Sequence, residues 1–293
     1  MQPWVTSFAE AEELIRKGTD SQRVLPVPVA EISRTVEKLR ERLPREPVNR
    51  LTPLDLPLRM LVVLPTYNER ENLKPMVRAI QGNLACDVLI VDDNSPDGTG
   101  KIADELAGST AGVHVLHRAE KQGLGRAYMA GFEWGLERDY ERLFEIDCDF
   151  SHPPWDLPRL AWAAQDYELV IGSRYVRGGG TEGWNALRRL LSTTANLYTR
   201  FFLGFGVHDY TAGFRCYSAD LLRHIDFERV VASGYSFQIE MTWLSKRAGV
   251  SILELPIRFV DRVTGASKMT GAIALEALPL VALLRFRRGK RQR

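Results

Sequence analysis

The sequence predicts an α/β domain whose mainly parallel sheet is covered by helices on both faces. From Arg59 onward, short and nearly continuous apolar strands alternate with amphipathic helices, which is typical of such sheets. Three of these strands end in polar loops rich in acidic residues. Because ligands of parallel sheets bind outside the carboxyl ends of the strands, these loops mark the candidate site.

Four strands are expected in order, at residues 60–65, 87–91, 113–117 and 143–146. A helix follows each of the first three strands: one ends near Gly82, one begins near Thr99, and one runs from Gly125 to about Arg138. The polar strand ends are Thr66-Tyr-Asn-Glu69, Asp92-Asp-Asn-Ser-Pro-Asp-Gly98 and Asp147-Cys-Asp149. The acidic groups of separate loops are therefore expected to meet at one edge of the sheet.

Changes in the proline and charge pattern divide the 293 residues into three parts. Residues 1–58 form an N-terminal extension with helices expected near 7–17 and 29–43, and one apolar face suited to docking on the main domain or a partner. Residues 59–270 form the α/β domain. Residues 271–293 combine an amphipathic helix at 273–284 with a tail in which six of the last nine residues are basic.

The composition excludes several classes of protein. Lys and Arg (39) nearly balance Asp and Glu (37), so the formal net charge of +2 provides no general field for nucleic acid. The three cysteines lack metal-ligand spacing and favour a reducing compartment. The first residues do not have the pattern of a signal peptide, and no run of 18 apolar residues predicts a membrane span.

The pair Asp147 and Asp149 is the strongest candidate for chemistry. Residues i and i+2 of an extended segment point to the same side, so both carboxylates can converge on one ion. Mg²⁺ and Mn²⁺ favour oxygen ligands and are commonly held by one or two carboxylates together with substrate phosphates. Solvated loop aspartates are the alternative interpretation of the pair.

The other candidates also have a structural interpretation. Asp92 and Asp93 can be turn residues, and Asp97 favours a helix cap. Gly123-Leu-Gly125 is neither a Walker A loop nor a dinucleotide fingerprint, which disfavours a Rossmann dehydrogenase. His152, followed by two prolines, favours a packed loop histidine over a general base.

A series of motifs carries a resemblance to a known family. The quoted segments, in chain order, are Val63-Leu-Pro65-Thr-Tyr67-Asn-Glu69, Ile90-Val-Asp92-Asp93, Asp147-Cys-Asp149-Phe-Ser-His-Pro, Ile171-Gly-Ser-Arg174-Tyr, Asp209-Tyr-Thr-Ala-Gly213-Phe-Arg215, Gly234-Tyr-Ser-Phe-Gln-Ile-Glu240 and Phe259-Val-Asp-Arg262-Val-Thr-Gly-Ala-Ser-Lys268. Over about residues 60–270 the chain resembles the inverting family 2 glycosyltransferases, and more narrowly the dolichol-phosphate or polyprenol-phosphate mannose synthases.

The resemblance implies a GT-A (Rossmann-like) fold, GDP-mannose as donor, a polyprenyl monophosphate as acceptor and Mg²⁺ or Mn²⁺ as cofactor. Residues that would contact the donor are Pro65, Tyr67, Glu69, Val91, Asp93, Asp147, Cys148, Asp149, Arg174, Arg262 and Lys268. The metal would be held by Asp147, Asp149 and Ser151, with a water as the alternative third ligand because some relatives carry Gln at the Ser151 position. The acceptor phosphate would contact Arg174, Arg188 and Ser192, and the catalytic residues would be Asp149, Arg174 and Arg215.

Three later segments bear on access to the site and to lipid. The glycine-rich segment 174–183 is expected to be a mobile loop over the site, or else an ordinary surface loop. Segment 184–203 mixes arginines with large apolar residues, which fits an amphipathic helix on a lipid headgroup surface or a core helix. The basic tail, residues 285–293, would attract anionic lipid. The expected location is peripheral, on the cytoplasmic inner face of the membrane, with direct lipid contact or a membrane-protein partner.

Two other functions remain open at this point. A polyprenyl-phosphate glucosyltransferase using UDP-glucose would differ in the nucleobase pocket and around Cys148 and Ser151. A catalytically silent nucleotide-sugar-binding subunit would be expected to have lost some of the motif residues, yet Asp149, Arg174 and Lys268 are all present.

Overall fold

The computed structural model describes residues 53–232, 234, 236–261 and 271–286. Its strands are β1 (Met60–Thr66), β2 (Asp87–Asp92), β3 (Val113–His117), β4 (Arg142–Glu145), β5 (Leu169–Ser173), β6 (Gly180–Glu182), β7 (Arg215–Ser218), β8 (Ile252–Pro256) and β9 (Arg258–Val260). The helices are α3 (Leu73–Asn83), α4 (Thr99–Ser109), α5 (Leu124–Leu136), α6 (Leu157–Ala163), α7 (Ala186–Leu203), α8 (Ala219–Arg223), α9 (Phe237–Ala248) and α10 (Gly271–Phe286), with short 3₁₀ turns η1 (Pro154–Asp156) and η2 (Phe227–Arg229).

The main sheet has seven strands in the order β3-β2-β1-β4-β7-β5-β8. Strand β7 runs antiparallel to β4 and β5, and the other neighbouring pairs are parallel. The predicted mainly parallel sheet is confirmed, and the four strands expected from the sequence are β1 to β4. Because β2, β1 and β4 are neighbours, their acid-rich ends lie along one edge.

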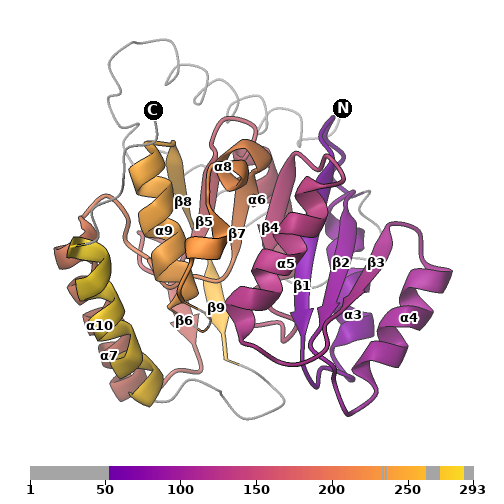
Figure 1. Cartoon of the computed structure of the whole chain (residues 1–293), viewed down its shortest axis with the longest axis horizontal. Coiled ribbons are helices and arrows are strands. Elements are labelled where there is room, and N and C mark those ends of the chain that lie inside the picture. Colours follow the sequence, from indigo (N-terminus) through magenta and orange to yellow (C-terminus); the bar gives the residue numbers. More distant parts are fainter. Residues whose placement is uncertain (1–52, 233, 235, 262–270, 287–293) are drawn as a thin grey trace.

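Alternation along the strands builds a core on each face of the sheet. Leu61 and Val63 of β1 join one apolar cluster with residues of α5, α8, α9 and α10. Val62 and Leu64 join the opposite cluster with residues of α3, α4 and α6. Helices therefore cover both faces, as the sequence predicted, and α5 and α9 can be followed on the same side in Figure 1.

A second sheet of two parallel strands pairs β6 with β9. Strand β6 lies within the glycine-rich segment that the sequence interpreted as a mobile loop. Gly179 precedes it, and a Cβ there would lie 2.6 Å from the carbonyl oxygen of Ser173. The glycine is therefore required for a tight return of the chain onto the end of β5, and the segment has a defined strand within it.

Helix α7 has its polar side turned inward and its apolar side turned outward. Ser192, Asn196 and Thr199 are buried on it, whereas its exposed large side chains are Leu187, Leu190, Leu191, Leu197 and Phe201. Helix α10 packs beside α7 at one end of the molecule (Figure 1), with Val281 and Leu284 buried and Leu283 and Phe286 exposed. This inverted pattern favours the surface helix over the core helix among the two sequence interpretations of segment 184–203.

The residues just before the boundary expected at residue 58 contact the α/β domain. Leu54, Leu56 and Leu58 pack against the core, and Leu54 forms a parallel bridge with Leu84. These residues belong with the α/β domain because they cover part of its apolar surface. The helices expected at 7–17 and 29–43, and the tail at 287–293, lie outside the described residues. Within the described residues, no helix has the length and apolar character needed to cross a membrane.

Candidate active site

Asp147 and Asp149 lie just after β4, in a turn where Phe150 has a φ of 60°. One Asp147 oxygen accepts a hydrogen bond from the Tyr128 hydroxyl (3.1 Å), and the other lies 3.7 Å from Nδ1 of His152. Asp149 accepts a hydrogen bond from the backbone N–H of Ser151 (2.9 Å). The structure thus places both carboxylates at the carboxyl edge of the sheet, in a turn instead of the extended segment expected.

The neighbours of the aspartates divide into core and site residues. The Cys148 side chain packs in the core, and burial raises the pKa of its thiol well above the usual range, so only its backbone is available to a donor. His152 is buried between the rings of Phe214 (5.6 Å) and Phe259 (5.2 Å), which fits the packed histidine favoured by the sequence.

The donor set fits a hard divalent ion held partly by its substrate. The Ser151 hydroxyl is buried and has no hydrogen-bond partner in the described part of the chain. No group of three or more His, Cys, Asp and Glu side chains among the described residues could hold an ion unaided. Two carboxylates and a hydroxyl leave coordination positions for phosphate oxygens, which is the usual arrangement for Mg²⁺.

The two aspartates that end β2 have different surroundings. Asp92 accepts hydrogen bonds from Thr66 Oγ1 (3.0 Å) and from the N–H and hydroxyl of Ser95 (3.1 and 2.6 Å), so it shapes the turn. Asp93 pairs with Nη1 of Arg118 at 2.6 Å. Burial raises the pKa of Asp93, and Arg118 and Lys121 oppose that shift. Asp93 is therefore the one whose carboxylate sits among cationic groups at the strand end.

The other residues expected at the nucleobase lie beside Asp93. Pro65 of β1 pairs in register with Val91 of β2, which is fully buried. The ammonium of Lys121 lies 4.0 Å from the centroid of the Tyr67 ring. The Glu69 carboxylate accepts a hydrogen bond from the side-chain amide of Asn72 (2.9 Å). The strand ends of β1 and β2 therefore gather these residues.

Asp97 has the capping role that the sequence favoured. Its Oδ1 accepts hydrogen bonds from the backbone N–H (3.0 Å) and hydroxyl (2.6 Å) of Thr99, the first residue of α4. These bonds satisfy donors at the helix start that have no intrahelical partner.

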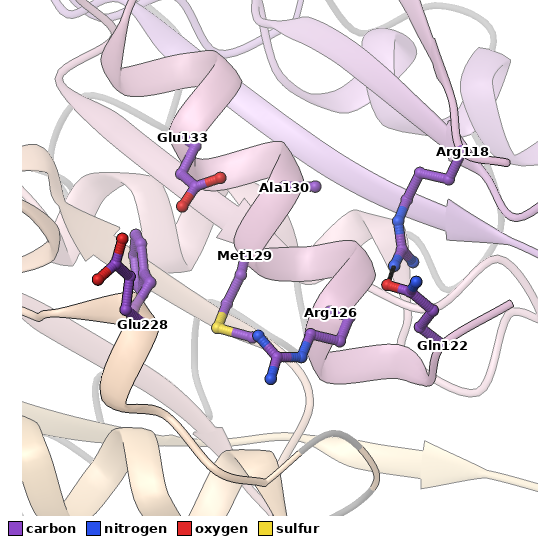
Figure 2. A pocket seen from close by; sticks show the side chains of 8 residues that line it. Arg118, Gln122, Arg126, Met129, Ala130, Glu133 and Glu228 are labelled. Atoms are coloured by element: carbon purple, nitrogen blue, oxygen red, sulfur yellow. Dashed lines mark hydrogen bonds between the residues drawn. The ribbon is translucent and has the colours of Figure 1, made fainter. Parts of the chain in front are cut away.

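A surface cavity of about 280 Å³ opens beside α5. Figure 2 shows Arg118 bonded to Gln122 on one side of this cavity, with Glu133 and Glu228 on the other. The full lining is Arg118, Gln122, Arg126, Met129, Ala130, Glu133, Phe227 and Glu228. The paired aspartates do not line it, and Arg118 connects it to Asp93.

Arg174, directly after β5, is held by Asp209. Asp209 accepts from Nε (2.8 Å), Nη2 (2.7 Å) and the backbone N–H (3.0 Å) of Arg174, and Nη2 also reaches Thr211 Oγ1 (2.6 Å). Burial acts to raise the pKa of Asp209, but Arg174 outweighs it and the pKa is lowered. Both partners are therefore charged, and the guanidinium has a fixed direction.

Arg215 occupies the core instead of the site surface. It is fully buried and donates to the carbonyl oxygens of Ala212 (2.6 Å) and Tyr210 (3.0 Å). Glu145 is its partner in the register of β4 and β7, and burial raises the pKa of Glu145 to about 8 although Arg215 opposes the shift. These contacts favour a structural role for Arg215, shaping the turn beside Asp209, over the catalytic role that the sequence suggested.

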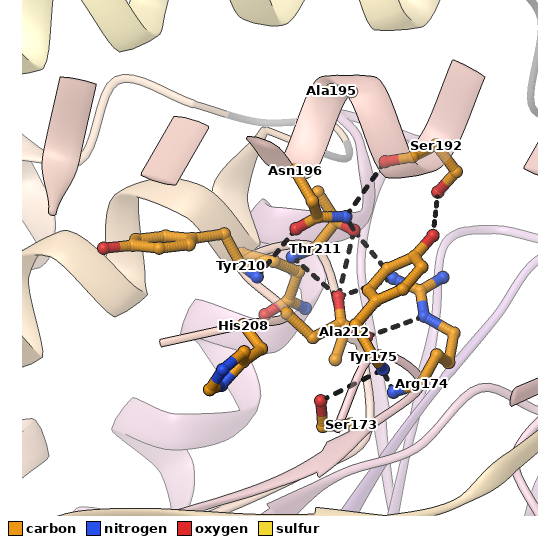
Figure 3. A network of polar contacts seen from close by, with 12 residues as sticks. Ser173, Arg174, Tyr175, Ser192, Ala195, Asn196, His208, Tyr210, Thr211 and Ala212 are labelled. Carbon is orange, nitrogen blue, oxygen red and sulfur yellow. Dashed lines mark hydrogen bonds and ion pairs between the residues drawn. The ribbon is translucent and has the colours of Figure 1, made fainter. Parts of the chain in front are cut away.

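The residues expected at the acceptor phosphate gather around two aromatic rings. The guanidinium carbons of Arg188 and Arg174 lie 4.3 and 5.8 Å from the centroid of the Trp184 ring. Ser192 accepts a hydrogen bond from the Tyr175 hydroxyl (2.7 Å), a contact visible in Figure 3. Helix α7 and the end of β5 thus bring Arg174, Arg188 and Ser192 together, whereas Arg262 and Lys268 lie outside the described residues.

The sequence did not assign a role to three residues that hold this arrangement together. Asp209 was named only as the first residue of the segment that ends at Arg215. An acidic residue in a segment that also contains an arginine could have indicated a partner for one of the arginines of the site. Trp184 and Tyr175 offered the weaker signal of aromatic residues next to arginines. Their contacts depend on how α7 packs, which short-range patterns do not contain.

Known proteins resemble the chain in sequence and in fold. Residues 61–226 match the model for glycosyl transferase family 2. The chain is 51% identical over 229 residues to a polyprenol monophosphomannose synthase of Mycolicibacterium smegmatis, covering 76% of this chain and 86% of that protein. It is 49% identical over 222 residues to an undecaprenyl-phosphate mannosyltransferase of Micrococcus luteus, covering 75% and 91%. Glucosyl-3-phosphoglycerate synthase of Mycobacterium tuberculosis, in a complex with UDP, has a similar fold, with a TM-score of 0.56, 17% identity and coverage of 78% and 80%.

Proposed function

The chain belongs to glycosyltransferase family 2, and we propose that it transfers a mannosyl group from GDP-mannose to a polyprenyl monophosphate. One observation supports the proposal: His152, beside Asp147, and Trp184, beside Arg174 and Arg188, pack against the same Phe259 ring, so the aspartates after β4 lie near these arginines. We assign these two groups as the two anion-binding ends of one site, beside a helix with an apolar outer face. The two relatives near 50% identity are named for mannosyl transfer to such lipids.

The nucleotide end is assigned to the strand ends of β1 and β2. A guanine base offers N–H donors along one edge, and Asp93 supplies a carboxylate acceptor there, at 2.6 Å from Arg118. Tyr67, with its ring under Lys121, supplies a flat apolar surface for the base. This arrangement supports GDP-mannose as the donor.

A divalent ion, Mg²⁺ or Mn²⁺, would be held by Asp147, Asp149 and the Ser151 hydroxyl. When bound, it neutralises negative charge that builds up on the departing diphosphate. The buried Ser151 hydroxyl, with no partner among the described residues, supports this assignment.

The acceptor end has the positive charge needed to hold the acceptor phosphate close to the donor diphosphate. Arg174 is fixed by Asp209 and Arg188 lies on Trp184, so their positive charges offset the repulsion between donor and acceptor phosphates. One oxygen of the acceptor phosphate forms the bond to the anomeric carbon while the bond from that carbon to the donor phosphate breaks. GDP leaves with the electron pair, and the configuration inverts to a β-mannosyl phosphate. The nucleophile, with a second pKa of about 6, is already ionised at neutral pH and needs no general base.

We place the protein peripherally on the cytoplasmic face of the membrane, and the outer face of α7 supports the contact with lipid. Its exposed leucines lie on the helix that also carries Ser192 and Arg188, and the exposed Leu283 and Phe286 lie on α10, which packs beside it. A prenyl chain leaving the phosphate would thus meet an apolar surface, and the basic residues of the last nine would attract anionic lipid.

The test is transfer of radiolabelled sugar to a short polyprenyl monophosphate, with GDP-mannose and UDP-glucose offered in parallel, each with and without EDTA. EDTA-sensitive transfer from GDP-mannose alone is expected. Transfer from UDP-glucose would correct the sugar and keep the acceptor, and absence of transfer from either donor, with or without a membrane fraction, would contradict the proposed reaction.

A further inference from the structure

Asp261, the residue directly after β9, pairs with one of the arginines expected at the acceptor phosphate. Its Oδ2 accepts a hydrogen bond from Nη1 of Arg188 at 2.8 Å. We propose that Asp261 is an internal stand-in for the acceptor phosphate: it holds Arg188 in place before the lipid arrives and yields Arg188 to the phosphate on binding. The inference rests on the proposed function, since it takes Arg188 as an acceptor-phosphate residue.

The two arginine–aspartate pairs at the acceptor end differ in the way that the exchange requires. Arg174 and Asp209 meet through two parallel bonds, with side chains only 7% and 0% exposed. Arg188 and Asp261 share one hydrogen bond, with side chains 23% and 32% exposed. Water reaches both side chains of the second pair, so this pair separates more easily than the buried first pair.

Unused donors lie beside the exchangeable pair. Nε of Arg188 and Nε1 of Trp184 are both buried without a hydrogen-bond partner among the described residues. The ring of Trp184 keeps the guanidinium 4.3 Å from its centroid, so Arg188 keeps its position when Asp261 withdraws. A phosphate has three oxygens with which to accept from such donors, whereas the carboxylate of Asp261 has two.

The backbone of Asp261 is anchored, so the exchange requires movement of the side chain only. Its N–H donates to the carbonyl oxygen of Glu182 (3.0 Å). Gly183, with a φ of +80°, packs so closely that a Cβ there would lie 2.9 Å from Cβ of Asp261. The carboxylate therefore returns to the same position after each turnover.

The charges of acceptor and product differ, so Asp261 competes less well for Arg188 with the acceptor than with the product. The acceptor monoester is mainly a dianion at neutral pH and competes well against a single carboxylate. The product is a phosphodiester with one negative charge, so Asp261 competes with it on equal terms and promotes its release. Asp261 is a positioning residue that acts through Arg188. It affects binding of the acceptor and release of the product.

The test is a double-mutant cycle on the full chain, with calorimetric titration of a short polyprenyl monophosphate and of its mannosylated product. Asp261→Asn is expected to tighten binding of both ligands roughly two- to fivefold, the range of a partly exposed ion pair. The dissociation constant for GDP-mannose should be unchanged, and kcat should fall because product leaves more slowly. Asp261→Glu keeps the carboxylate and should retain the wild-type affinities for both ligands. Glu182→Gln, in the same small sheet, is the matched control and should also bind as the wild type does.

In the Arg188→Ala background, Asp261→Asn should change neither titration, because the competing interaction is absent. Weaker acceptor binding by Asp261→Asn, or an effect that persists without Arg188, would overturn the inference. Wild-type protein that binds the phosphate but transfers no mannose would count against the proposed function alone, because the titrations still test Asp261. Wild-type protein that binds no polyprenyl phosphate would remove both.

Discussion

Asp209 accepts hydrogen bonds from Nε and Nη2 of Arg174. These two bonds fix the orientation of the guanidinium, and Nη1 takes no part in them. The carboxylate is itself fixed, because Glu254 of β8 accepts from the backbone N–H of Asp209 (2.9 Å) and of His208 (2.7 Å). An arginine held this way has lost its rotamer freedom before a ligand arrives. Binding an anion to it therefore costs little further ordering.

Asp209→Asn should damage both stability and rate. Removing one charge of a buried pair leaves the other uncompensated, which costs about 3–5 kcal/mol, and a misdirected Arg174 should lower transfer on the order of 10²-fold. Thermal unfolding and initial transfer rates measure the two effects. Asp220→Asn, which removes an 86% exposed partner of Arg223, is the control and should change stability by less than about 0.5 kcal/mol. Normal rates in Asp209→Asn would contradict the positioning role.

Asp149→Ala should abolish mannosyl transfer and leave the fold intact. The substitution removes a proposed metal ligand in a turn at the sheet edge, and no apolar core contact is lost. Manganese binding followed by paramagnetic resonance should weaken in parallel with activity. Asp166→Ala, at an exposed aspartate in another loop, should behave as wild type. Near-normal activity of the Asp149 variant would refute the metal assignment.

Leu190→Glu should reduce binding to vesicles that contain anionic lipid. Leu190 is 64% exposed on the outer face of α7, so the change should alter the free energy of unfolding by less than about 0.5 kcal/mol. Flotation with vesicles and transfer in detergent are the two measurements, and only the first should fall. Val231→Glu, at a 54% exposed valine away from α7, is the matched control. Equal flotation of both variants would argue against α7 as the lipid-facing surface.

Glu145→Gln should change how stability depends on pH. Burial raises the pKa of Glu145 to about 8 in the folded state, above its usual value of 4.5. Between these values the folded state keeps a proton that the unfolded state releases, so the wild type loses stability as pH rises and the loss is complete above pH 8. Relative to wild type, the variant should gain on the order of 2–4 kcal/mol between pH 4.5 and 8, measured by urea unfolding. A constant difference would show that Glu145 is already ionised in the fold.

Two N-terminal truncations should separate the extension from the domain. Deleting residues 1–52 should spare transfer in detergent, because no site motif lies there. Deleting residues 1–58 also removes Leu54, Leu56 and Leu58, whose contacts with the core are worth about 1 kcal/mol each. The second truncation should therefore unfold at a lower temperature than the first, by differential scanning calorimetry. Identical transitions would show that the three leucines do not stabilise the domain.

Much of the fold could be predicted because its signals are local. The strands β1 to β4 and the helices between them were expected within a few residues, since apolar runs, glycines and acid-rich ends follow one another along the chain. The antiparallel insertion of β7 between β4 and β5 was not expected, because strand order depends on long-range packing. The small sheet of β6 and β9 was missed for the same reason.

The candidate site was predictable to the extent that its residues follow strand ends. Asp147, Asp149 and Asp93 follow β4 and β2 directly, so their convergence follows from a parallel sheet. The partners of the arginines come from α7, β8 and β9, at sequence distances that no short pattern reports. The motif that contains Arg215 suggested a catalytic role, and the sequence did not predict that this residue is fully buried in β7.

The inward polar face of α7 has a thermodynamic meaning. Most helices of a globular protein use their apolar side to drive folding, but α7 is secured by its Asn185 cap, by Tyr175 and by Asn196, which bonds to Thr211. The exposed leucines of α7 stay in contact with solvent in the folded chain, so their burial does not contribute to folding. Burial of these leucines lowers the free energy only when the protein associates with another apolar phase. The affinity for that phase can therefore change through evolution without altering the stability of the fold.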